Sequence, residues 1–344
     1  MILTLTPNPS LDRTVSLPGP LQRGTVQRLT GVVMEPGGKG VNVARVLSNS
    51  GRAATAVLPA AEHDPILAAL GALELPGLTV HPVLVTGAAR INTAVTEPDG
   101  TTTKLNEAGA ELGPEEIDAV ETALLDVVAA SPGAGSEGSE DPDGADARSW
   151  AVLSGSLPPG APADWYARLV RLLRGSAPGL RIAVDTSDEP LTALAAGLPE
   201  VAPDLIKPNG EELGQLVGLP AGRAMTLEEG ARRGELEPVI DAAGVLVDRG
   251  VGAVLATLGP AGAVLATGDG SWHATAPDVP VVSTVGAGDS SVAGYVLADV
   301  RGEGPAGRLA SAMAYGSAAA SLPGTTLPTP GDLPARAAVI TRLA

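Results

Sequence analysis

The sequence predicts an α/β protein in which helices cover a mainly parallel, doubly wound β-sheet. Strand-like runs of Val, Leu, Ile and Ala alternate with helical patterns along almost the whole chain, which is typical of βαβ units. The 344 residues contain no Phe and only 2% aromatic residues, so the core has to be built from aliphatic side chains. Such a core suits a parallel sheet with helices on its faces.

The strands expected in this sheet have the sequences ILTLT, ATAVL, LTVHPVLV, SWAVLSG, RIAVDTS, DLIKPN and AVLATLG, in that order. Helix-like segments lie between most of them. Ser154, Ser156, Asp185 and Asn209 come where these strands end. Ligands of doubly wound sheets bind beyond the carboxyl ends of the strands, so we expect the site at this edge.

Two segments depart from the alternation. Residues 13–35 and 90–107 show alternating strand patterns with turn signals and no helix, and the second turns at PDG. We expect them to form a small β-sheet lid. Residues 131–148 are acidic, rich in Gly and Ser and without periodicity, which predicts a flexible, solvated insertion in an otherwise single domain over residues 1–344.

The composition favours a cytoplasmic protein. There are no cysteines, and the apolar run at the N-terminus is too short for a signal peptide. The uncharged stretch 250–268 is broken by Gly259, Pro260 and Gly262, so it predicts two strands joined by a glycine turn rather than a membrane span.

The net charge of −17 argues against binding to nucleic acid, which requires clustered Lys and Arg. An anionic ligand would therefore need positive charge concentrated locally. The chain has only three lysines, Lys39, Lys104 and Lys207, and nearly every other basic residue is Arg. These lysines are either phosphate ligands or ordinary surface residues, and the motifs around them favour the first.

Lys39 lies in PGGKGVNVARVL, a glycine-rich turn that runs into a helix with an apolar face. The stretch does not fit a Walker A loop. Its glycines would let a ligand approach the backbone, while Lys39 and Asn42 supply a cation and an amide. This combination indicates an anion or sugar site.

The stretch STVGAGDSSVAG raises two alternatives for Asp289. It does not satisfy the dinucleotide-binding pattern, since Ser291 replaces the third glycine and Asp289 would repel a pyrophosphate, so hydride transfer is disfavoured. For phosphoryl transfer, the N–H groups of residues 286–289 could cradle the transferred group while Asp289 takes a proton. The alternative is that Asp289 is merely the N-cap of a helix.

The stretch KPNGEEL places Asn209 and Glu212 three residues apart. That pair suits a hydrated Mg²⁺ on nucleotide phosphates, or else marks a helix N-terminus capped by Asn209. The three histidines fall outside all of these motifs, which argues against histidine catalysis and against a zinc cluster.

Together, NPSLD, PGGKGVNVARVL, LSGSLPPG, KPNGEEL, TLGPAGA and STVGAGDS resemble, in sequence order, the motifs of the ribokinase-like (PfkB) carbohydrate kinases. The resemblance covers the chain apart from residues 131–148. It implies a three-layer α/β/α sandwich with a mainly parallel central sheet and a β-sheet lid. It also implies ATP as phosphoryl donor, Mg²⁺ as metal and a homodimer formed through the lid, with no nucleic acid or membrane partner.

The resemblance assigns a role to each motif. It implies that Asp289 is the catalytic base and that the backbone of Gly286, Ala287 and Gly288 forms the anion hole. The implied nucleotide site comprises Lys207, Asn209, Thr257, Leu258, Gly259, Pro260, Ala261, Gly262 and Gly288, with Asn209 and Glu212 acting on the metal. The implied sugar contacts are Asp12, Gly38, Lys39, Asn42, Arg90, Lys104 and Ser156.

The cations Lys39, Arg90 and Lys104 favour a sugar phosphate over a neutral sugar, and KLNEAG resembles the branch of the family that acts on fructose 1-phosphate. We therefore expect phosphorylation of D-fructose 1-phosphate at the 6-hydroxyl, with tagatose 6-phosphate and fructose 6-phosphate as alternative substrates. Two rival classes are a non-catalytic sugar-phosphate sensor, for which loss of Asp289 would be the mark, and a dehydrogenase.

Overall fold

The computed structural model describes residues 1–130 and 148–343, and the acidic segment 131–147 lies outside the described residues. The expectation of a flexible insertion therefore stays a prediction, except at its last residue. Arg148 donates to the buried carboxylate of Asp299 at 3.1 Å, so this residue belongs to the folded body.

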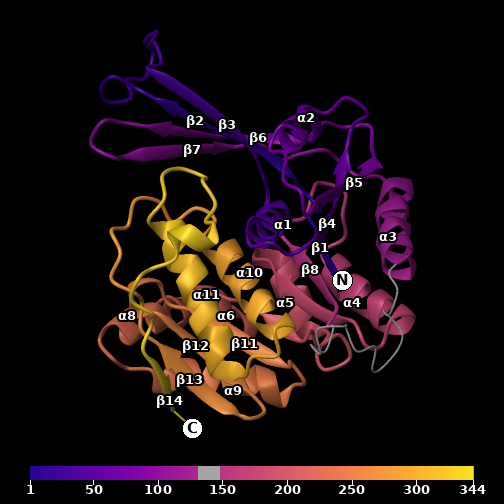
Figure 1. Ribbon diagram of the computed structural model, residues 1–344, viewed down its shortest axis with the longest axis vertical. Helices are drawn as coiled ribbons and strands as arrows, with labels where there is room; N and C mark the ends of the chain where they lie inside the picture. The colour runs from indigo at the N-terminus through magenta and orange to yellow at the C-terminus, as the bar shows by residue number, and fades with distance from the viewer. Residues whose placement is uncertain (131–147, 344) are drawn as a thin grey trace.

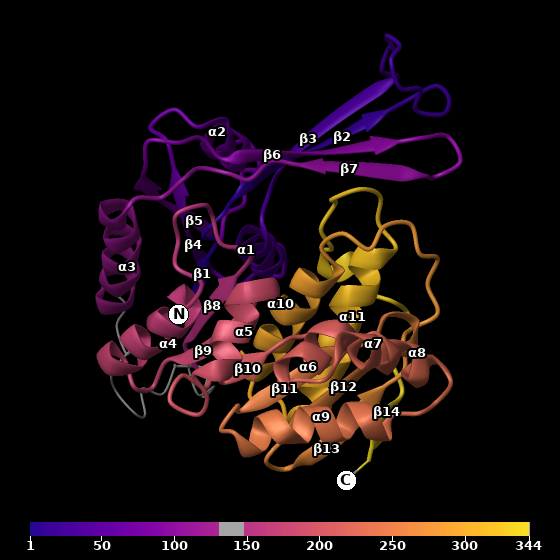
Figure 2. The same cartoon turned by 180° about the vertical axis from the view of Figure 1, so that it is seen from behind.

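The main sheet has ten strands in the order β14-β13-β12-β11-β10-β9-β8-β1-β4-β5 (Figures 1 and 2). Neighbours from β11 to β5 run parallel, while the pairs from β11 to β14 are antiparallel, which confirms a mainly parallel sheet. The expected glycine turn is the short 3₁₀ helix η1, Gly259–Ala261, between β11 and β12. The strands are β1 Ile2–Leu5, β4 Ala54–Ala60, β5 Leu78–Leu84, β8 Trp150–Ser154, β9 Arg181–Asp185, β10 Leu205–Ile206, β11 Ala253–Thr257, β12 Ala263–Thr267, β13 Gly270–Ala274 and β14 Ile340–Arg342.

Helices cover both faces of this sheet (Figures 1 and 2). One face carries α1 Lys39–Asn49, α10 Ala287–Val300 and α11 Pro305–Ala320, and the other carries α3 Pro114–Ala129, α4 Trp165–Ser176, α5 Asp188–Ala196, α6 Gly210–Leu216 and α9 Glu237–Asp248. Shorter helices are α2 Pro65–Gly71, α7 Ala221–Ala224, α8 Thr226–Arg232 and the 3₁₀ helix η2 Pro330–Asp332.

The alternating side chains of β8 show how the two cores form. Trp150 and Val152 pack with α1 and α10, whereas Ala151 and Leu153 pack with α4 on the opposite face. Successive side chains of a strand point to opposite faces of the sheet. Because helices pack against both faces, the expected three-layer sandwich is confirmed. None of the helices in the described ranges is long and apolar enough to cross a bilayer.

The lid is a separate four-stranded sheet in the order β3-β2-β6-β7. Its strands are β2 Ser10–Ser16, β3 Gly31–Gly37, β6 Arg90–Thr96 and β7 Thr102–Asn106. The first pair of strands extends beyond the expected bounds 13–35, because Ser10 already pairs with both Gly37 and Arg90. The lid projects over the loops that join β13 to α10 and α11 to β14 (Figure 2).

Candidate active site

The carboxyl edge of the main sheet gathers the polar motifs. Asp185 is the last residue of β9, and Lys207 directly follows β10. Helix α1 begins at Lys39 and helix α10 begins at Ala287, two residues before Asp289. Parallel strands end at a common edge, so residues far apart in the sequence meet there.

Asp289 lies in the first turn of α10 and is 7% exposed. Its Oδ2 accepts a hydrogen bond of 2.8 Å from Nδ2 of Asn42 in α1. The N-cap of α10 is Gly286, whose φ of 75° is in the left-handed region, and no side chain caps this helix. The alternative that Asp289 is merely a helix cap is therefore wrong.

Burial, and next the nearby carboxylate of Asp185, raise the pKa of Asp289 to about 6 against the opposing effects of Lys39, Asn42 and Lys207. A group that accepts a proton during catalysis works best when its pKa is close to the working pH. Asp289 is thus a carboxylate at neutral pH that can accept a proton without a large energetic penalty.

Asp185 joins the two lysines of the site and is 2% exposed. Its Oδ1 lies 2.9 Å from Nζ of Lys39 and 3.4 Å from Nζ of Lys207. Burial alone would raise the pKa of Asp185, but Lys207 and Lys39 outweigh burial and hold that pKa below its ordinary range. Burial opposes the charge of Lys39, yet Asp185 raises the pKa of Lys39 and keeps it protonated.

Lys207 also lies against the backbone at the start of α10. It is 6% exposed, and a Cβ added at Gly288 would be 3.3 Å from its Nζ. An ammonium beside the N–H groups of a helix N-terminus adds to the positive potential there. The structure thus brings Asp289, Lys207 and the predicted anion hole together.

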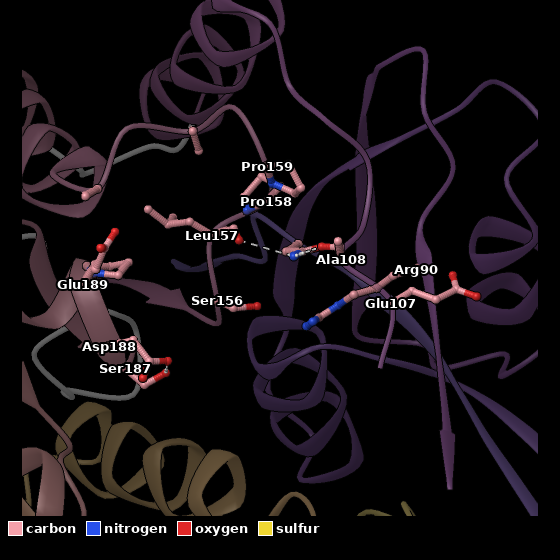
Figure 3. A pocket seen from close by; sticks show the side chains of 14 residues that line it. Arg90, Glu107, Ala108, Ser156, Leu157, Pro158, Pro159, Ser187, Asp188 and Glu189 are labelled. Carbon is pink, nitrogen blue, oxygen red and sulfur yellow. Dashed lines mark hydrogen bonds between the residues drawn. The ribbon is translucent and has the colours of Figure 1, made fainter. Parts of the chain in front are cut away.

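A cavity of about 540 Å³ opens between the lid and the carboxyl edge of the main sheet. Of the predicted sugar contacts, Arg90 and Ser156 line it, and their side chains point toward each other across it (Figure 3). Nε of Arg90 and Oγ of Ser156 are buried and have no hydrogen-bond partner among the described residues. Two polar groups left unpaired in a cavity are suited to receive a ligand.

The other predicted sugar contacts lie elsewhere. Lys39 faces Asp185 rather than this cavity, and Lys104 is exposed on β7. Arg90 is therefore the one cation among the described residues that line the cavity. Asp12, on β2, accepts hydrogen bonds from Ser10 at 2.9 Å and from Asn92 at 3.0 Å. Gly38 is the N-cap of α1 with a φ of 104°, which glycine alone adopts readily.

A second cavity, of about 530 Å³, lies at the start of α10. Four residues of the predicted nucleotide stretch line it, namely Thr257, Gly259, Pro260 and Gly262. Residues of α10 and α11 also line it, namely Ala287, Gly288, Ser291, Met313 and Gly316. Leu258 does not line it, because its side chain is fully buried in the core. The side chain of Ala261 also packs against that core and is absent from the cavity wall that the structure describes.

Asn209 and Glu212 form a capping box at the start of α6. Oδ1 of Asn209 accepts from the Glu212 N–H at 2.8 Å, and Oε2 of Glu212 accepts from the Asn209 N–H at 2.8 Å. The capping alternative is therefore confirmed. Hydrated Mg²⁺ needs only one or two carboxylates besides substrate phosphates, and Oε1 of Glu212 is not part of the box, so the pair still fits such an ion. No cluster of three or more His, Cys, Asp or Glu suited to a metal occurs within the described ranges.

With this geometry in place, comparison with known proteins decides the family. The model of the pfkB family of carbohydrate kinases matches residues 8–331. The chain belongs to this family. As a pfkB kinase it is a phosphotransferase with an alcohol group as acceptor, and the fold agrees with this membership.

Individual relatives match along nearly the whole chain. The 1-phosphofructokinase of Rhodobacter capsulatus is 36% identical over 99% of this chain and 96% of its own length. The ATP-dependent 6-phosphofructokinase isozyme 2 of Escherichia coli (strain K12) is 32% identical over 95% of this chain and 94% of its own. A crystal structure of phosphofructokinase-2 from Escherichia coli, in complex with substrates and products, superposes with a TM-score of 0.78 at 30% identity and covers 96% of each chain.

Proposed function

We propose that this pfkB kinase transfers the γ-phosphoryl group of ATP to the 6-hydroxyl of D-fructose 1-phosphate and forms fructose 1,6-bisphosphate. The observation that carries the proposal is the buried carboxylate of Asp289 in the first turn of α10, next to Gly288, which lines the second cavity. The lid-covered cavity supplies Arg90 for the phosphate of the sugar. The similarity to a 1-phosphofructokinase over 99% of the chain supports this choice of substrate.

In this mechanism the acceptor hydroxyl gives its proton to Oδ1 of Asp289, since Oδ2 is held by Asn42. The N–H groups of Gly286, Ala287 and Gly288 receive the γ-phosphoryl group, and Lys207 beside Gly288 balances its charge. Mg²⁺ would be held through the free oxygen of Glu212 and would neutralise charge on the nucleotide phosphates. Asp185 holds Lys39 and Lys207 in place around the reacting groups.

The substrate is tested by measuring kcat/KM with fructose 1-phosphate, fructose 6-phosphate and tagatose 6-phosphate. We expect fructose 1-phosphate to give the highest value. Fructose 6-phosphate is the second candidate, since a 6-phosphofructokinase is also 32% identical to the chain, and it yields the same bisphosphate. A higher kcat/KM with fructose 6-phosphate or tagatose 6-phosphate would reject the proposed substrate, and no turnover with any of the three would favour a sensor.

Arg90→Ala is expected to raise the KM for the sugar phosphate roughly tenfold to a hundredfold, with a smaller effect on kcat. The variant removes the one cation among the described residues of the lid-covered cavity, and a charge-assisted contact contributes about 1.5–3 kcal/mol. Lys104→Ala is the control, because Lys104 is a lid cation that is exposed and outside this cavity. Equal KM values for the wild type and Arg90→Ala would place the sugar's phosphate elsewhere.

We further propose a cytoplasmic homodimer that forms through the lid. On one face of the lid, Val32 and Met34 of β3 and Leu105 of β7 are 53%, 48% and 59% exposed, and the strand register aligns Met34 with Leu105 across the sheet. A second copy of the chain would remove this apolar surface from water. Sedimentation at micromolar concentration tests the dimer, and a Met34→Lys variant should then sediment as a monomer. A monomeric wild type would rule the dimer out.

A further inference from the structure

The loop of residues 321–328, which follows α11, contacts the lid beside the proposed sugar site. Oγ1 of Thr325 donates a hydrogen bond to Oε2 of Glu35 on β3. The strand register places Glu35 directly opposite Asp12 on β2, and Ser10, two residues before Asp12, pairs with Arg90 of the proposed sugar site. On the neighbouring strand, Oγ1 of Thr14 lies 3.9 Å from the position of a Cβ added at Gly324. This loop therefore lies close to β3 and to β2, the strand that pairs with β6, to which Arg90 belongs.

The same loop contacts the turn that leads into α10. Oγ of Ser283 donates to the carbonyl of Gly324 at 2.8 Å and accepts from the N–H of Val285 at 3.2 Å. Leu327 is 6% exposed, and its Cδ2 is 3.1 Å from the position of a Cβ added at Gly286. The loop is thus in contact with the residues that set the position of the proposed anion hole.

Glu35 is itself held by the main body of the protein. Its Oε1 lies 3.6 Å from Nη2 of Arg45 in α1, and Nη1 of Arg45 donates to the carbonyl of Pro36 at 2.6 Å. Arg45 is 6% exposed, so this end of β3 is attached to a buried group. The Thr325 hydroxyl therefore bonds to a carboxylate whose position depends on the lid strand and on α1.

We infer that Thr325 is a positioning residue that couples binding of the sugar phosphate under the lid to binding of ATP at the start of α10. Both ligands favour the same arrangement of loop 321–328, since this loop contacts Gly286 of the proposed anion hole and also the lid strand β2, which pairs with Arg90 of the sugar site. Two ligands that favour the same arrangement of one element raise each other's affinity by the same factor. This inference rests on the proposed placement of the two substrates, and Thr325 touches neither of them.

The test measures the Kd of a non-hydrolysable ATP analogue by calorimetry, with and without a saturating sugar phosphate, in the wild type and three variants. Thr325→Val removes the hydroxyl that bonds to Glu35 at nearly constant size, and Thr325→Ser keeps that hydroxyl. Thr326→Val makes the same chemical change one residue away, where the threonine is exposed and its side chain has no hydrogen bond among the described residues. The sugar phosphate used is whichever hexose phosphate the wild type phosphorylates.

We expect the sugar phosphate to tighten binding of the analogue severalfold or more in the wild type, Thr325→Ser and Thr326→Val. In Thr325→Val this factor should fall at least threefold, while the Kd without sugar phosphate changes less than twofold. A purely structural role would instead shift stability and leave the factor intact. The inference is overturned if the wild type shows no coupling, or if Thr325→Val keeps the wild-type coupling factor. It is also overturned if Thr326→Val lowers the coupling factor as much as Thr325→Val does. Turnover of a hexose phosphate other than fructose 1-phosphate would reject the proposed substrate only.

Discussion

Asp289→Asn is expected to fold normally and to phosphorylate the sugar with kcat reduced about 10²–10⁴-fold. Asn has the size of Asp, and its side-chain oxygen can still accept the hydrogen bond from Asn42. It cannot accept the proton of the acceptor hydroxyl. Binding of ATP and of the sugar phosphate should persist, because the lost interaction matters mainly in the transition state.

The pH dependence gives a second readout for Asp289. Because burial and Asp185 raise its pKa to about 6, wild-type kcat/KM should fall about tenfold per pH unit below that value.

A carboxyl with a raised pKa favours the folded state at low pH, and this contribution is lost as pH rises through about 6. At pH 8 the Asn variant should therefore unfold at the same temperature as the wild type or at a higher one. If Asp289→Asn has a kcat within about threefold of the wild-type value, the assignment of Asp289 as the catalytic base is wrong.

The main sheet could be predicted because its strands are aliphatic runs that end in polar or glycine-containing turns. Stretch 250–268 illustrates this, since its central glycines mark the turn between β11 and β12. The lid could also be located, because alternating patterns without a helix identify it. The bounds of its strands could not be predicted, since Ser10 pairs with Arg90 and these two residues lie far apart in the sequence.

The site was predicted in part. Arg90 and Ser156 line the cavity under the lid, and Asp289 is buried in the first turn of α10, while their roles in phosphoryl transfer stay predictions. The bridge from Asp185 to Lys39 could not be predicted, since it joins residues 146 positions apart and depends on how α1 crosses the end of β9. Lys104 lies on the same face of the lid as Asp12, but β7 is the edge strand of the lid and is exposed on both faces at Lys104 and Leu105, which no local pattern of polar residues indicates.

The cavity under the lid also contains residues that the motifs did not single out. Asn8 lines it and donates to the carbonyl of Ala108 at 2.9 Å, and its place in NPSLD was the available signal. Asp188 and Glu189 line the opposite wall at the start of α5. Nothing in their local sequence distinguishes them from acidic residues that merely begin a helix. Only the approach of α5 to the lid makes them part of the site.

Asp185→Asn is expected to lower the free energy of unfolding by about 3–5 kcal/mol, because it leaves the buried ammonium of Lys207 without its carboxylate partner. Denaturant unfolding at pH 7 measures this loss. Glu229→Gln is the control, since it removes an ion pair with Arg233 that is 3.6 Å long and exposed, and it should cause no measurable loss.

A further substitution separates the buried charge from other effects of Asp185→Asn. Adding Lys207→Met should restore part of the lost stability, since the double variant no longer contains an unpaired ammonium at that position.

Loss of the Asp185 carboxylate should also change the pH dependence of catalysis. Asp185 raises the pKa of Asp289, so without it the acidic limb of kcat/KM should move below pH 6. A stability loss under about 1 kcal/mol together with an unshifted acidic limb would show that Asp185 neither holds the lysines nor influences the base.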